Sequence, residues 1–222
     1  MSLDDSNQEN FIRFAIEANI LSFGKFKTKA GRLSPYFFNT GGFNDGTRLS
    51  VLGRHYAKAL QESKIHFDMI YGPAYKGITL AAATAIALAD EGCNVPYAYN
   101  RKEAKKHGEG GLLIGAPIKG KVVIVDDVIS AGTSVRESVD LIRTAGAEPA
   151  AVLIALDRME KSGTAAEIGE KSAVQAVEQE FGFPIIAIAN LADLMFFLTA
   201  SSDAELTNHL PAVKAYHEKY GI

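Results

Sequence analysis

Residues 121–134, Lys-Val-Val-Ile-Val-Asp-Asp-Val-Ile-Ser-Ala-Gly-Thr-Ser, decide the fold class of this chain. Val122 to Val125 form an unbroken β-branched run, which favours a strand buried on both faces of a sheet. After the turn, apolar residues return at helical spacing, at Val135, Val139 and Ile142. The pattern predicts a buried strand, an acidic pair, a turn of small residues and the start of a helix.

The turn after this strand carries the chemistry. Unpaired N–H groups at a helix start favour an anion, and Gly132 lets the backbone approach a ligand closely. Further donors are the hydroxyl groups of Ser130, Thr133 and Ser134. A phosphate suits this turn, whereas Asp126 and Asp127 would repel it and should face a vicinal diol or a cation. A ligand that offers both a phosphate and a diol is a ribose 5-phosphate.

The same stretch resembles the phosphoribosyl diphosphate (PRPP) motif of the type I phosphoribosyltransferases. The P-loop and Gly-x-Gly-x-x-Gly patterns of other nucleotide-binding proteins are absent. An ordinary strand-to-helix turn with two solvated aspartates is the alternative, and the Asp pair and Gly-Thr in register disfavour it. The resemblance implies that Asp126 and Asp127 are catalytic. It also implies PRPP contacts from Asp126, Asp127, Val128, Ile129, Ser130, Ala131, Gly132, Thr133 and Ser134.

The segment from Phe26 to Asn39 combines cations with an aromatic trio, and its glycine and proline favour turn and extended structure. Taken alone, it could equally be a cationic hairpin whose aromatic side chains sit in the core. It resembles the Lys-x-Gly-Arg-x-Ser-Pro-Tyr-Phe-Phe-Asn stretch of orotate phosphoribosyltransferases. That resemblance implies that Lys29 contacts PRPP and that Phe37 and Phe38 contact orotate.

A second candidate anion site is Gly72-Pro-Ala-Tyr-Lys-Gly77, between a predicted strand at 67–71 and an Ala-rich helix at 78–90. The alternative is a tight turn with an exposed lysine. The loop resembles the one that holds the PRPP diphosphate in this family, which implies contacts from Tyr75 and Lys76.

Residues 100–111, Asn-Arg-Lys-Glu-Ala-Lys-Lys-His-Gly-Glu-Gly-Gly, gather cations in an acidic chain. We expect no regular structure from Asn100 to Gly120, and such a segment is typically a functional lid or disordered. The alternative is a solvated charged face. The segment resembles the mobile catalytic loop of orotate phosphoribosyltransferases, which reaches the neighbouring subunit's site in a homodimer. The resemblance implies catalysis by Lys105 and PRPP contacts from Arg101, Lys102, Lys105 and His107.

Leu156-Asp-Arg-Met-Glu160 follows a predicted strand at 150–156. An arginine at the end of such a strand lies on the ligand side of an α/β sheet. The alternative is a surface ion pair of Arg158 with Asp157 or Glu160. The motif resembles the family's Leu-Asp-Arg-x-Glu, which implies that Arg158 holds the orotate carboxylate and that Ser130 also contacts orotate. A planar guanidinium with two parallel donors suits a carboxylate.

Apolar runs at 67–71, 95–99, 122–126, 150–156 and 185–189 mostly alternate with helical patterns. They predict an α/β fold, a parallel five-stranded sheet flanked by helices. We expect one phosphoribosyltransferase domain over 1–222 with its core at about 65–190. A small hood would come from residues 1–40 and the C-terminal helices. Residues 160–171 are expected to form a loop.

Charge, cysteine content and the length of apolar stretches indicate which classes of protein this chain does not resemble. A net charge of −3 and a pI near 6.0 disfavour nucleic-acid binding. Cys93 is the single cysteine, so no intramolecular disulfide forms, and a reducing, cytoplasmic location fits. The polar N-terminus shows no signal peptide, and the longest apolar-rich stretch, 78–89, is too short to span a membrane.

The resemblance implies a pentosyltransferase of pyrimidine biosynthesis that converts PRPP and orotate to orotidine 5′-phosphate and diphosphate. Mg²⁺ would be carried mainly by the diphosphate, with no direct protein ligand. A purine or uracil phosphoribosyltransferase would share the central motif but lack the Arg158 contact. A PRPP-sensing regulator that binds nucleic acid is disfavoured by the charge and by the lack of an added DNA-binding domain.

Overall fold

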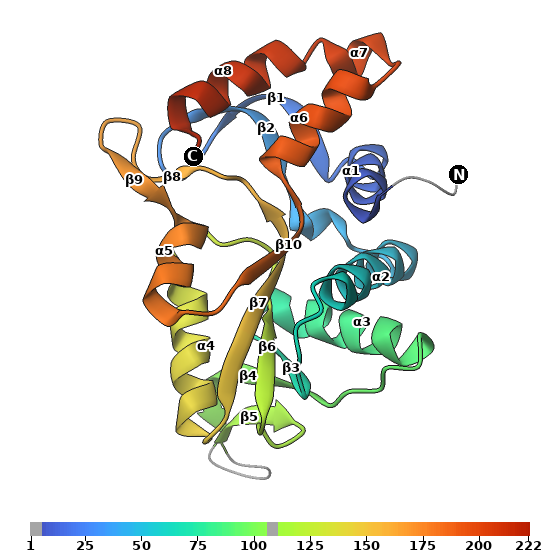
Figure 1. Cartoon of the computed structure of the whole chain (residues 1–222), viewed down its shortest axis with the longest axis vertical. Helices are drawn as coiled ribbons and strands as arrows, with labels where there is room; N and C mark the ends of the chain where they lie inside the picture. The colour runs from blue at the N-terminus through green and yellow to red at the C-terminus, as the bar shows by residue number, and fades with distance from the viewer. Residues whose placement is uncertain (1–5, 106–110) are drawn as a thin grey trace.

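The computed structural model describes residues 6–105 and 111–222, and its centre is a six-stranded sheet of order β10-β7-β6-β3-β4-β5 (Figure 1). The strands that run parallel are β3 (Met69–Gly72), β4 (Tyr97–Lys105), β6 (Lys121–Val125), β7 (Glu148–Asp157) and β10 (Ile185–Asn190). The edge strand β5 (Gly111–Gly115) is antiparallel to β4. The predicted parallel α/β sheet is confirmed, and β5 adds a strand that was not predicted.

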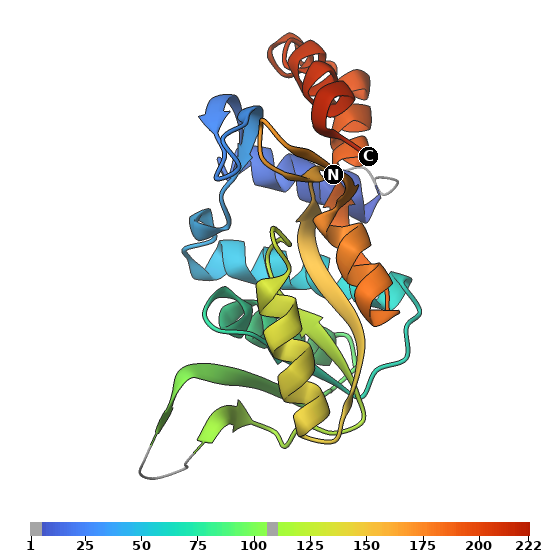
Figure 2. The same cartoon turned by 90° about the vertical axis from the view of Figure 1, so that its left-hand side faces the viewer.

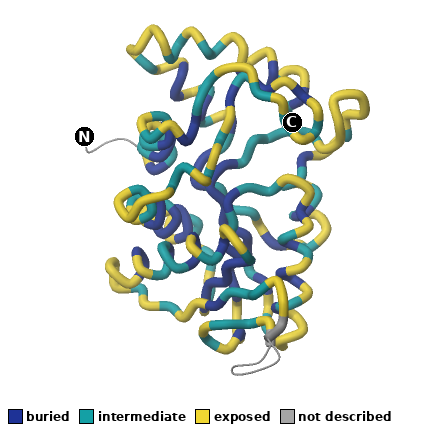
Figure 3. Tube along the Cα trace, turned by 180° about the vertical axis from the view of Figure 1, so that it is seen from behind, coloured by how far each residue is buried: buried dark blue, intermediate teal, exposed yellow. Residues whose placement is uncertain are grey.

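Helices cover both faces of this sheet (Figure 1). On one face lie α1 (Asn7–Glu17), α2 (Gly46–Glu62) and α3 (Lys76–Asp90), and on the other lie α4 (Thr133–Thr144) and α5 (Ala173–Phe181). The buried residues follow the sheet and the inner sides of these helices (Figure 3).

The β-branched run of β6 is fully buried because its side chains alternate between two cores. Val123 and Val125 belong to the cluster beneath α1, α2 and α3, while Val122 and Ile124 belong to the cluster beneath α4 and α5. Successive side chains of a strand point to opposite faces. A central strand with helices on both sides therefore needs an apolar residue at every position.

The two ends of the chain pack together. An N-terminal hairpin of β1 (Leu21–Lys27) and β2 (Leu33–Phe38) lies beside α8 (Leu210–Tyr220), with α6 (Leu191–Ala200) and α7 (Ala204–Thr207) preceding it (Figures 1 and 2). Phe23 stacks on His209 with ring centroids 4.5 Å apart, and Tyr36 meets Tyr216 edge-on at 6.3 Å. Aromatic contacts thus hold the hairpin to the C-terminal helices.

Two segments expected to lack regular structure contain strands, so those predictions were wrong. β4 continues through the charged residues to Lys105 and pairs with β5, and this pair projects from the body of the molecule (Figure 2). The 160–171 segment contains β8 (Lys161–Gly163) and the start of β9 (Ile168–Ser172), which form a hairpin. Backbone hydrogen bonds build both ladders, and exposed charged residues such as Lys102, Glu103 and Glu170 interrupt any apolar alternation in the sequence.

Candidate active site

The carboxyl ends of neighbouring strands bring the singled-out segments to one edge of the sheet. β3 ends at the 72–77 loop, β6 ends just before Asp126, and β7 ends just before Arg158. β6 pairs with both β3 and β7, and the N–H of Asp126 donates to the carbonyl of Leu153 at 3.0 Å. Ligands of open α/β sheets bind at this edge, so these segments can serve one site.

Asp127 is the point where three segments meet. Its Oδ2 accepts hydrogen bonds from Lys76 Nζ at 2.6 Å and from Thr40 Oγ1 at 2.7 Å, and Lys76 Nζ also donates to Thr40 Oγ1 at 2.8 Å. Thr40 opens a short 3-10 helix, η1 (Thr40–Gly42), which follows β2. Burial alone would raise the pKa of Asp127, but the hydrogen bonds and charge of Lys76 and the hydroxyl of Thr40 outweigh it. They hold the pKa below its usual value, so Asp127 is an anion at neutral pH.

Asp126 lies in a different environment. Its carboxylate accepts from Ser134 Oγ at 3.0 Å and from the N–H of Asp127 at 2.9 Å, and its carbonyl accepts from the Tyr56 hydroxyl at 2.8 Å. Burial, and next the charge of Asp127, raise the pKa of Asp126 to about 6. The adjacent carboxylates are therefore electrostatically unequal, and one of them titrates close to neutral pH.

The turn from Ser130 to Ser134 is an open cradle of N–H groups. Within residues 6–105 and 111–222, none of its backbone N–H groups has a protein acceptor. Gly132 has a left-handed φ of +72°, and a Cβ there would lie 2.8 Å from Val177. Arg136 fixes the turn by donating to the Ala131 carbonyl at 2.7 Å while it pairs with Glu180. The turn is thus preformed for an anion.

Residues 72–77, which run from the end of β3 into the first turn of α3, offer a second set of N–H groups. Those of Tyr75, Lys76 and Gly77 have no acceptor in the described part of the chain. A Cβ on Gly77 would lie 2.8 Å from the Val125 carbonyl oxygen, so the glycine lets this loop pack against the end of β6. The Tyr75 ring is 71% exposed and lies 6.0 Å from Lys102 Nζ. The loop therefore presents N–H groups and cations beside the acidic pair.

The predicted lid residues Arg101, Lys102 and Lys105 belong to one strand. Arg101 and Lys102 lie in β4, and Lys105 is its last residue. His107 lies outside the described residues. The cationic segment therefore begins on a strand that is continuous with the central sheet.

The aromatic pair of β2 is divided between its two faces. The Phe37 side chain is 46% exposed and stacks on Phe26 with centroids 5.4 Å apart. Phe38 packs against Phe11 of the core at 6.2 Å. Lys29 is exposed in the turn between β1 and β2. Neighbouring residues of a strand point to opposite sides, so Phe37 and Phe38 do not form a single wall.

Arg158 is held on three sides. Its Nε and Nη2 donate to Glu160 Oε1 at 2.8 and 2.5 Å, Nη2 also donates to Ser34 Oγ at 3.2 Å, and the guanidinium lies 4.4 Å from the centroid of Tyr36. An ion pair with Glu160, the alternative raised from the sequence, is therefore present, with the Arg158 side chain only 22% exposed. The sequence did not reveal the parts played by Ser34 and Thr40, because a lone hydroxyl residue beside a turn gives no signal of its own.

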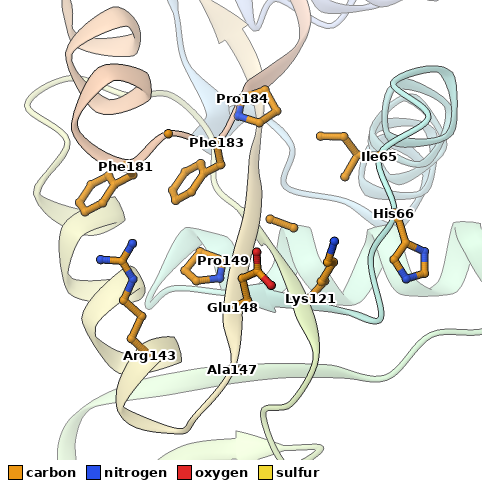
Figure 4. A pocket seen from close by; sticks show the side chains of 12 residues that line it. Ile65, His66, Lys121, Arg143, Ala147, Glu148, Pro149, Phe181, Phe183 and Pro184 are labelled. Atoms are coloured by element: carbon orange, nitrogen blue, oxygen red, sulfur yellow. The ribbon is translucent and has the colours of Figure 1, made fainter.

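A separate cavity of about 450 Å³ lies at the opposite edge of the sheet (Figure 4). Lys121 and Glu148, the first residues of β6 and β7, line it together with Arg143, Phe181 and Phe183. None of the residues predicted to bind PRPP or orotate lines this cavity, so it is distinct from the candidate site.

Comparisons with known proteins agree with this geometry. The model of the phosphoribosyl transferase domain matches residues 43–179. The orotate phosphoribosyltransferase of Polynucleobacter asymbioticus is 82% identical over 222 residues, which is all of both chains. That of Cupriavidus metallidurans is 65% identical and covers 98% of this chain and 97% of its own.

A solved structure supports the same family. The crystal structure of orotate phosphoribosyltransferase from Francisella tularensis matches with a TM-score of 0.85 and 36% identity, covering 96% of this chain and 100% of that one. In the part of this chain that the structure describes, no helix has the length and apolar character needed to cross a membrane. Sequence identity over the full length, the domain match and the fold agree, and the chain belongs to the orotate phosphoribosyltransferase family.

Proposed function

We propose that this chain transfers the 5-phosphoribosyl group of PRPP to orotate, a pentosyltransferase reaction of pyrimidine biosynthesis. The observation that carries the proposal is the meeting of the Asp126–Asp127 pair with two sets of unpaired N–H groups at one sheet edge. The products are orotidine 5′-phosphate and diphosphate.

The ribose 5-phosphate half of PRPP occupies the acidic pair and the turn after it. The N–H and hydroxyl groups of residues 130–134 receive the 5-phosphate. Asp126 and Asp127 face the ribose hydroxyls. As the C1–O bond to diphosphate breaks, positive charge builds on the ribose, and the two carboxylates offset it. Orotate N1 forms the new bond to C1 and gives its proton to solvent water, while diphosphate leaves with the electron pair of the C1–O bond.

The diphosphate half lies beneath cations and donors. Lys76 Nζ has three N–H donors, of which Asp127 and Thr40 engage two, so one is left for a diphosphate oxygen. The proposed diphosphate contacts are Lys29, Tyr75, Lys76, Arg101, Lys102, Lys105 and His107. They neutralise the charge that the leaving group gains.

A magnesium ion fits this site as a companion of the substrate. No three Asp, Glu, His or Cys side chains are grouped to hold a metal among residues 6–105 and 111–222. Asp126 and Asp127 offer carboxylate oxygens, but Lys76 already neutralises Asp127. Mg²⁺ commonly keeps its waters and binds substrate phosphates with one or two carboxylates. When bound, it would supply charge neutralisation to the departing diphosphate.

The surface of α3 supports a homodimer. Ile86 of α3 is 64% exposed. Tyr97 of the adjacent β4 is also exposed. The two exposed apolar residues lie on a helix and a strand that contact each other, and burying them together is the contact we propose for the subunit interface. In the proposed dimer the 100–111 segment reaches the neighbouring subunit's site. Neither nucleic acid nor membrane is a proposed partner, and a cytoplasmic location stays a prediction.

Diphosphate release with a panel of bases tests the function. The wild-type protein, PRPP and Mg²⁺ should release diphosphate with orotate, and much less with uracil, hypoxanthine or adenine. Arg158→Ala should raise the KM for orotate because it removes the carboxylate contact. Release with uracil or a purine but not with orotate would overturn the proposal in favour of another phosphoribosyltransferase.

A further inference from the structure

Glu160 lies between two guanidinium groups. Its Oε1 accepts from Arg158 at both Nε and Nη2, and its Oε2 is 3.8 Å from Arg32 Nη1. The Tyr36 hydroxyl donates to the same Oε1 at 3.4 Å. The Glu160 side chain is 16% exposed, so this carboxylate joins the two arginines inside the protein.

Arg32 is the immobile member of the group. Its side chain is 2% exposed, and its guanidinium lies 4.7 Å from the centroid of Tyr220. Its terminal nitrogens donate to the backbone carbonyls of Lys161, Ser162, Gly163 and Thr164. These contacts hold the Arg32 guanidinium in place on one side of Glu160.

Arg158 is the more exposed arginine of the group. Its side chain is 22% exposed, and besides Glu160 it has the ring of Tyr36 and a 3.2 Å hydrogen bond to Ser34. Glu160 and Ser34 engage Nε and Nη2, so Nη1 is the nitrogen that these two residues leave for a substrate carboxylate. The Tyr216 hydroxyl also interacts with this guanidinium. Glu160 therefore determines which edge of the guanidinium a ligand can meet.

The charge balance of the group depends on Glu160. Arg32, Arg158 and Glu160 together carry one net positive charge, and an uncompensated charge inside a protein is costly. Without the carboxylate, two guanidinium groups would face each other. Arg32 is locked by carbonyls, so Arg158 would swing toward solvent.

We infer that Glu160 is a positioning residue that holds Arg158 against Tyr36 with Nη1 directed to the orotate carboxylate. This rests on the proposed function, in which Arg158 receives that carboxylate. Glu160 occupies the opposite edge of the guanidinium and does not compete with the substrate for Nη1.

The test compares Glu160→Gln with Arg158→Ala, the double variant and Glu167→Gln, an exposed carboxylate on the β8–β9 turn that serves as control. Glu160→Gln should raise the KM for orotate roughly tenfold or more, the loss expected for a hydrogen bond to a charged group. The KM for PRPP and kcat at saturating orotate should change less than about twofold. In the Arg158→Ala background, Glu160→Gln should add almost nothing, because it acts through Arg158.

The outcomes separate the role of Arg158 from that of Glu160. If Arg158→Ala leaves the KM for orotate unchanged, the role proposed for Arg158 fails. If Arg158→Ala raises it but Glu160→Gln leaves it unchanged or lowers it, only the inference about Glu160 is overturned. A rise in the KM for both substrates would make Glu160 a structural residue. Should Glu160→Gln not fold, Glu160→Asp takes its place, because it keeps the charge but draws the carboxylate away from Arg158. An unchanged KM for orotate in that variant would overturn the inference.

Discussion

The ammonium of Lys76 lies 2.6 Å from Oδ2 of Asp127, which ties the loop after β3 to the acidic pair after β6. Neither residue is near the other in sequence, and the pairing of β3 with β6 brings them together. The cation keeps Asp127 ionised while it retains a donor for a ligand. One contact thus couples the sugar side of the site to the diphosphate side.

Lys76→Met should weaken PRPP binding. The change removes a charge-assisted contact worth about 1.5–3 kcal/mol, which corresponds to a rise in the KM for PRPP on the order of ten- to a hundredfold. Lys58→Met, which removes an exposed lysine of α2 that pairs with Glu62 at 3.9 Å, is the matched control and should leave the KM unchanged. Equal KM values in the two variants would remove Lys76 from the diphosphate site.

Asp126→Asn should change stability in a pH-dependent way. The pKa of Asp126 is raised from 3.8 to about 6 in the folded protein, so the folded state binds this proton more tightly than the unfolded state. The favourable contribution is complete below pH 4 and is lost as pH rises through about 6. Above that, the ionised carboxylate costs on the order of 2–3 kcal/mol, which the amide avoids.

Urea unfolding of the wild type and of Asp126→Asn at several pH values measures the free energy of unfolding of each protein. Asp126→Asn should be more stable than wild type at pH 7.5, and the gain should shrink as the pH falls from 7 to 4. A difference that does not vary with pH would mean that Asp126 titrates normally.

Gly132→Ala should damage the phosphate turn more than it damages the fold. Its φ of +72° strains any other residue, and the new Cβ would lie 2.8 Å from Val177. Gly146, at the other end of α4, has a φ of +80° with open space around it, so Gly146→Ala carries the strain without the clash. Gly146→Ala should lose about 1–2 kcal/mol of stability from the backbone strain, and Gly132→Ala should lose more because of the added clash. Only Gly132→Ala should raise the KM for PRPP. A similar rise in Gly146→Ala would trace the effect to stability alone.

Lys105→Ala should lower turnover strongly while the melting temperature stays that of the wild type. The proposed reason is the lost neutralisation of diphosphate as the C1–O bond breaks. Steady-state rates at saturating substrates, together with thermal unfolding, measure both. Wild-type turnover in the variant would refute a catalytic role for this lysine.

The sequence predicted the fold best where buried side chains produce a recognisable pattern of apolar residues. The run at Val122–Val125 predicted a central strand because each side chain enters one of two cores. The β4–β5 extension was missed because exposed residues such as Lys102 and Glu103 leave no apolar alternation, and backbone pairing defines it. Resemblance located Arg158, but it did not reveal that Glu160 engages its Nε and Nη2. Likewise, the sequence did not reveal the hydrogen bond from Thr40 to Asp127, because only the folded chain brings these two residues together.

A crystal structure of the protein with PRPP and Mg²⁺ tests the placement of the substrate most directly. The 5-phosphate should accept hydrogen bonds from the N–H groups of residues 130–134, with the ribose hydroxyls on Asp126 and Asp127 and the diphosphate at Lys76. Diphosphate bound in the 130–134 turn, or PRPP bound away from the acidic pair, would contradict the account.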